Sequence, residues 1–116
     1  MKTRVPALAL LLMFLMSNAV YAQETRLNNT LATVSFSGTT ANCIVDIVAD
    51  GDEIVATIEL LCGSQSIKTW DRSVDNGHLM FHETVSVTKG KTYELVVEYT
   101  VNGKAQSSFS GSGTCK

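Results

Sequence analysis

The sequence lacks most features that would assign it to a large functional class. After residue 22, no apolar run is long enough to span a bilayer, so we expect no stable membrane insertion. Residues 23–116 carry seven basic and eleven acidic side chains, a formal charge of 7 − 11 = −4. The basic residues are scattered, which argues against a nucleic-acid partner because phosphate binding depends on clustered lysine and arginine. No nucleophile elbow surrounds any serine, and we expect no enzyme activity.

The sequence also predicts no metal site and no cofactor. The spacing of Cys43 and Cys62 matches no zinc pattern. His78 and His82 are four residues apart, about 13 Å along a strand, which is too far for both to ligate one ion. The acidic segment 50–53 lacks the spaced oxygen ligands of an EF-hand loop. We interpret this segment as an ordinary turn and the two histidines as solvated or edge residues.

The first 22 residues have the pattern of a cleaved export signal. Lys2 and Arg4 precede the ten-residue apolar run ALALLLMFLM, and the segment ends in VYA, with small residues at the positions that signal peptidase reads. The run is too short for a transmembrane helix, which needs roughly 20 apolar residues. We therefore expect a signal peptide at 1–22, secretion into the extracellular medium, and one domain over 23–116.

Alternation of apolar and polar residues dominates the chain after residue 30 and predicts an all-β domain. No segment has helical spacing over three turns. The expected strands are 31–36, 40–47, 56–62, 66–71, 78–87, 93–101 and 105–114. Asn-Gly, Asp-Gly and related turn signals separate them at intervals of about a dozen residues. Seven short, evenly spaced strands favour a seven-stranded immunoglobulin-like antiparallel sandwich, with a small barrel as the alternative.

Two residues within these strands are unusual. Glu83 falls on the apolar side of the strand at 78–87, which indicates a bulge or an edge position. Trp70 is the one tryptophan of the chain, and we expect it in the core or as half-buried cover. The alternative is a stacking platform for a sugar or a peptide, assisted by Tyr93 or Tyr99.

The three cysteines raise the question of a disulfide. Alternating strand directions bring Cys43, Cys62 and Cys115 to one end of the domain, and thiols that lie close together in an exported protein tend to join. We favour Cys43–Cys62, with Cys43–Cys115 as the runner-up and buried free thiols as a further alternative. The favoured pairing leaves Cys115 unpaired on a C-terminal segment expected to be flexible and accessible, and this predicts a disulfide-linked dimer.

Three motifs give the chain a resemblance to known proteins. They are Thr-Ala-x-Cys around Cys43, the strand that carries Trp70, and the VTKGKTY turn that leads into the strand at 93–101. Together with the signal peptide, this order resembles small uncharacterised exported proteins of Gram-positive bacteria that are predicted to form immunoglobulin-like sandwiches. The resemblance implies the fold, and it supplies no activity and no functional residue.

These observations favour a binding module over other function classes. Immunoglobulin-like sandwiches commonly act through loops or exposed sheet faces, by analogy of fold. The expected partner is a protein or a glycan, and the sequence assigns no ligand-binding residue. A secreted toxin or antimicrobial factor is the alternative function.

Cleavage after Ala22 gives a direct prediction. The mature protein is expected to begin at Gln23 and to appear in the culture supernatant, because the signal peptide is removed during export. Intact-mass analysis of supernatant and membrane fractions measures both properties. A protein that retains residues 1–22, or that stays with the membranes, would contradict the export prediction.

Overall fold

The computed structural model describes residues 29–49 and 52–116. The expected signal peptide and the turn residues Asp50 and Gly51 lie outside the described residues. Within the described part, the chain forms eight β-strands and no helix. The strands are β1 (Asn29–Ser37), β2 (Thr40–Val48), β3 (Ile54–Cys62), β4 (Gln65–Val74), β5 (His78–Ser86), β6 (Thr92–Val101), β7 (Lys104–Ala105) and β8 (Phe109–Thr114).

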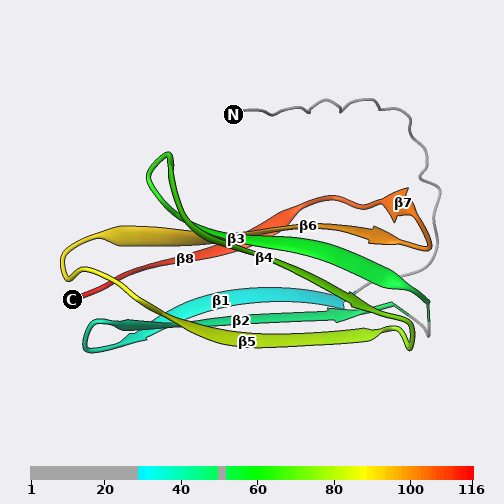
Figure 1. The fold of residues 1–116 in the computed structure, drawn as a ribbon, viewed down its shortest axis with the longest axis horizontal. Helices are drawn as coiled ribbons and strands as arrows, with labels where there is room; N and C mark the ends of the chain where they lie inside the picture. The colour runs from blue at the N-terminus through cyan, green and yellow to red at the C-terminus, as the bar shows by residue number, and fades with distance from the viewer. Residues whose placement is uncertain (1–28, 50–51) are drawn as a thin grey trace.

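The strands form two antiparallel sheets that lie one above the other (Figure 1). One sheet has three strands in the order β1-β2-β5. The other has five, in the order β4-β3-β6-β7, and β8 also pairs with β6. This confirms the predicted all-β, two-sheet antiparallel fold. The predicted count of seven strands is wrong by one, because the last expected run divides into the short β7 and the longer β8.

The core lies between the sheets and follows from the alternation in the sequence. Every second residue of β2, β3 and β6 is buried, and the residues between them face outward. The largest fully buried side chains are Ile47, Ile54, Ile58, Leu60, Leu79, Leu95, Val45, Val97, Cys43 and Cys115. Aromatic rings complete the packing, with Phe109 of β8 meeting Tyr99 edge-on at 5.6 Å between centroids. Phe109 is thus the anchor of β8 on the core.

The Asn-Gly turn between β6 and β7 forms as its sequence predicts. Asn102 and Gly103 have φ values of 51° and 81°, and two positive φ values in succession define the type I′ turn that matches the twist of a hairpin. The Asn102 side chain accepts a hydrogen bond from the Glu53 amide at 3.0 Å, and the Asn102 amide donates to the Glu53 carbonyl at 2.8 Å. These bonds tie the turn to the start of β3.

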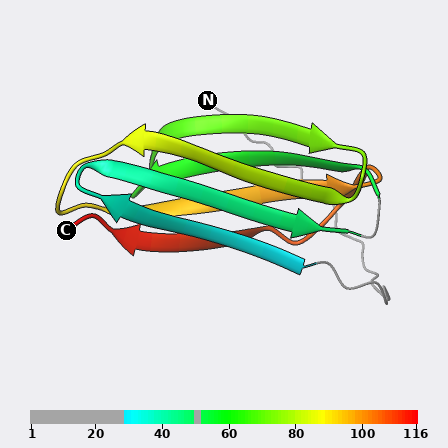
Figure 2. The same cartoon turned by 90° about the horizontal axis from the view of Figure 1, so that it is seen from below.

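The sandwich is closed on one side by a close approach of β8 to β1. Figure 2 shows the two strands along the same side of the molecule, with β8 in red and β1 in cyan. Gly111 lies so near the Ala32 carbonyl that an added Cβ would overlap it, and a Cβ on Gly113 would lie 3.0 Å from both the Val34 carbonyl oxygen and the Phe36 ring. The glycines therefore let the backbones of two strands from different sheets come into contact.

Adding a methyl group at this contact is expected to destabilise the fold. The Gly111→Ala variant must push β8 away from β1, and overpacking of this kind costs about 1–3 kcal/mol of unfolding free energy. Urea unfolding of the purified domain measures the change. The control is Ser112→Ala on the exposed face of β8, which should change stability little. Equal stability of the two variants would show that the glycine contact is unimportant.

Candidate functional site

The three cysteines are free thiols in the structure, and no pair lies at disulfide distance. The expected Cys43–Cys62 bond and its runner-up Cys43–Cys115 are therefore both unformed. Cys43 is the fourth residue of β2, so it lies about 10 Å along the strand from the end at which the other two cysteines lie. Burial raises the pKa of the Cys43 thiol from its ordinary value of 9.0 to about 11.

Cys62 is separated from Cys43 by the shape of the β3–β4 hairpin. The register between these strands shifts at Leu60 and Leu61, and a bulge of this kind bends the strand that carries it. In Figure 1 the hairpin turns away from the three-stranded sheet at the upper left. Cys62, at the end of β3, is consequently half-buried and belongs to the other sheet from Cys43.

Cys115 is buried, which corrects the expectation of a flexible and accessible C-terminal cysteine. Its Sγ donates a hydrogen bond to the Gly38 carbonyl at 3.2 Å, and its amide donates to the Lys91 carbonyl at 3.0 Å. The residue thus joins the β1–β2 turn to the start of β6 and closes one end of the core. The Cys115 thiol is not exposed in this conformation, and the disulfide-linked dimer stays a prediction.

Trp70 lies in the core, as expected, and the stacking-platform alternative is wrong. Its side chain is 8% exposed and meets the Phe81 ring at 5.0 Å between centroids in an edge-on geometry. Tyr93 and Tyr99, the suggested helpers of a platform, are buried as well. None of these rings is available to stack on a ligand in this conformation.

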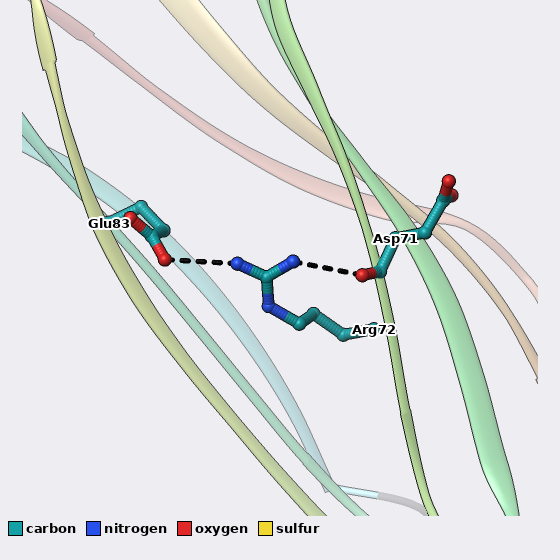
Figure 3. A network of polar contacts seen from close by, with 3 residues as sticks. All are labelled: Asp71, Arg72 and Glu83. Atoms are coloured by element: carbon teal, nitrogen blue, oxygen red, sulfur yellow. Dashed lines mark hydrogen bonds and ion pairs between the residues drawn. The ribbon is translucent and has the colours of Figure 1, made fainter.

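The side of the sandwich between β4 and β5 is joined by polar and aromatic contacts. Arg72 of β4 reaches across to Glu83 of β5, with Nη2 at 3.0 Å from Oε2, and its Nη1 donates to the Asp71 carbonyl at 2.9 Å (Figure 3). The guanidinium also lies 5.3 Å from the centre of the Phe81 ring. Glu83 occupies an edge strand in continuous register with β2, which confirms the edge interpretation over the bulge.

The outer face of the three-stranded sheet exposes three large apolar side chains. Leu31 is 53% exposed, Ile44 36% and Met80 74%. In the strand register, Leu31 and Met80 lie on either side of Asp46, in the row next to that of Ile44. Ile44 is therefore diagonal to both, at a separation that long side chains bridge. We call these three residues the apolar face.

Few charged groups lie near the apolar face, and they point away from it. Asp46 Oδ1 accepts a hydrogen bond from His78 Nε2 at 2.8 Å, so its carboxylate points along the sheet toward His78. His82 lies opposite Ile44, and both histidines are exposed, as the sequence predicts. The remaining outward residues of β1 are Asn29, Thr33, Ser35 and Ser37.

The outer face of the other sheet has the opposite character. It presents four carboxylates, from Glu59, Asp71, Glu94 and Glu98, among many serine and threonine hydroxyls. Some of these groups bond to one another, with the Thr57 hydroxyl donating to Asp71 at 3.1 Å and the Thr92 and Thr114 hydroxyls 2.8 Å apart. Val55 is the one exposed large apolar residue that the described part of this sheet adds. The two outer faces therefore differ sharply in the partners that they suit.

Within residues 29–49 and 52–116, no group of three or more histidine, cysteine, aspartate or glutamate side chains is arranged to hold a metal ion. The same residues include no helix with the length and apolar character needed to cross a bilayer.

No protein-family model matches the chain, and no curated protein matches it. Among solved structures, the solution structure of R. palustris CsgH superposes with a TM-score of 0.43 and 6% sequence identity. The match covers 76% of this chain and 92% of that one.

The apolar face was not recognised from the sequence. The signal in the sequence is that Leu31, Ile44 and Met80 each stand at a position of the strand alternation where a polar residue is expected. The three residues lie together only because of the register between β1, β2 and β5, and local sequence patterns do not specify that register.

Thiol accessibility tests the placement of the cysteines. In the reduced native protein, iodoacetamide is expected to modify Cys62 first, because Cys43 and Cys115 are buried and the raised pKa keeps Cys43 protonated at neutral pH. Peptide mass spectrometry of a timed alkylation identifies the modified residue, and alkylation in denaturant should reach all three thiols. Modification of native Cys115 as fast as Cys62 would contradict its burial.

Proposed function

We propose that this protein is a secreted binding module that recognises a protein partner through its apolar face. Leu31, Ile44 and Met80 support this proposal because all three are exposed and lie together on one sheet face. Exposed apolar side chains that gather on one surface are typical of interaction sites, whereas single ones are common on any protein. Methionine adapts its shape to different partners, and Met80 is the most exposed of the three.

The distribution of charge supports a protein partner over a polyanion. The outer face of β4-β3-β6-β8 presents carboxylates, which repel anionic ligands. The outer face of β1-β2-β5 carries one carboxylate within its described strands, Asp46, and this group is bonded to His78. When a partner binds there through an apolar patch of its own, few charged groups on either protein lose their hydration. A glycan partner fits less well, because Trp70, Tyr93 and Tyr99, the rings considered for stacking on a sugar, are buried.

We also propose that the sandwich is of the immunoglobulin-like type. The first, second and fifth strands form one sheet, and the third, sixth and last strands belong to the other, as in immunoglobulin domains. The fourth strand pairs with the third. This order supports an immunoglobulin-like sandwich, and the N-terminal export pattern supports secretion of the domain.

Substitution of the apolar face tests the function. The Leu31→Ser/Met80→Ser double variant is expected to lose a partner that the wild-type domain retains, with affinity falling by about tenfold or more as for central anchors of an interface. Immobilised wild-type and variant domains are incubated with the same cell-surface extract, and retained proteins are quantified by mass spectrometry.

The matched control is Val55→Ser on the opposite sheet, which removes a similarly exposed apolar side chain. It should retain the partner at the wild-type level. Equal retention by all three proteins, or loss through Val55→Ser alone, would contradict the proposed surface. A glycan array probed with the wild-type domain separates sugar binding from protein binding.

A further inference from the structure

The strands β4 and β5 are edge strands on the same side of the sandwich. Among the strands that the structure describes, β4 pairs with β3 alone and β5 pairs with β2 alone. Each therefore has a neighbouring strand on one side and, within this part of the chain, none on the other. Figure 2 shows both along the side opposite β1 and β8. An edge strand presents unpaired backbone groups, which can pair with a second chain. The β1–β8 side differs, because the glycine contact closes it.

Of the two edges, β5 has the features that favour pairing with another strand. It runs in continuous register with β2 over nine residues, and it carries apolar side chains on both faces, Leu79 and Phe81 inward and Met80 outward. β4 is protected by its own geometry. Its register with β3 shifts near Lys68, and a bulge together with an edge lysine is a common defence against intermolecular pairing.

The ion pair between Arg72 and Glu83 is the protective feature at β5. Glu83 lies on the inward side of its strand, where an apolar residue would fit the core pattern, and Arg72 meets it from the facing sheet (Figure 3). Their side chains remain 41% and 43% exposed, so water still solvates both charges. Any chain that covered this side would remove that water from the pair, which is unfavourable for charged groups.

We infer that the Arg72–Glu83 pair guards β5 against pairing with β5 of a second copy of this chain. Two copies related by a twofold axis would extend their three-stranded sheets into one continuous six-stranded sheet, with the same strand contributed by each. The pair would then lie beneath the new contact. The charge on the inward side of β5 thus keeps the protein monomeric while the apolar face beside it stays exposed.

Replacing the pair with apolar residues of similar size tests this inference. The R72M/E83L double variant removes both charges and places apolar side chains of similar length against Phe81 and the core, and its fold is checked by circular dichroism. Sedimentation velocity over a dilution series is expected to show a monomer for the wild type and twice that mass for the variant. Hydrogen exchange should show slower exchange of β5 amides in the variant than in the wild type.

Two further variants separate the loss of the Arg72–Glu83 pair from the general effect of adding apolar surface. Glu98→Leu adds apolar surface on β6, which is paired on both sides, and it should remain monomeric. The charge-reversed R72E/E83R variant restores the pair and should also remain monomeric. If R72M/E83L fails to fold, R72Q/E83Q carries the test, because it removes both charges and keeps long side chains at the two positions, and it should dimerise at high concentration.

The inference is overturned if the folded variant stays monomeric throughout the dilution series. It is also overturned if Glu98→Leu dimerises to the same extent, or if the slowed amides lie outside β5. Adding Leu31→Ser to R72M/E83L should leave the dimer intact, and loss of the dimer would assign self-association to the apolar face instead.

Discussion

The packing of two inner sheet faces across one apolar core determines the rest of this structure. Alternation in β2, β3 and β6 sends every second side chain into that core, and burial of apolar area is the main favourable term in folding. The same alternation leaves two outer faces whose composition the core does not constrain. One carries carboxylates and hydroxyls, and the other carries Leu31, Ile44 and Met80. Their difference is what gives the molecule a candidate binding surface.

The two sides of the sandwich are closed by different chemistry. On the β1–β8 side, Gly111 and Gly113 let the backbone of β8 lie directly against β1, beside the Phe36 ring. On the β4–β5 side, Trp70 packs on Phe81, and Arg72 spans the opening to reach Glu83. Cys115 closes one end of the core through its bond to the β1–β2 turn. A residue that looked like a free C-terminal thiol is therefore part of the packed structure.

Much of the fold could be predicted from local sequence patterns. The strands, the Asn102-Gly103 turn, the buried Trp70 and the edge position of Glu83 follow from alternation, turn chemistry and one misplaced charge. The relations between strands could not be predicted in this way. The sequence predicts a flexible Ser- and Gly-rich segment before Cys115. In the structure this segment forms β8 and contacts β1, a strand of the other sheet whose position local patterns do not specify. The prediction of a Cys43–Cys62 disulfide was wrong for a similar reason, because the spacing of the cysteines does not specify the bend of the β3–β4 hairpin.

The outer face of β1-β2-β5 is the surface that we propose meets a partner. Methyl chemical-shift mapping by NMR, with the captured partner added to the isotopically labelled domain, locates the residues in contact. We expect the methyl signals of Leu31, Ile44 and Met80 to shift or broaden on addition, while those of Val55 on the opposite sheet stay in place. Changes confined to Val55 or to the loops at the ends of the sandwich would contradict it.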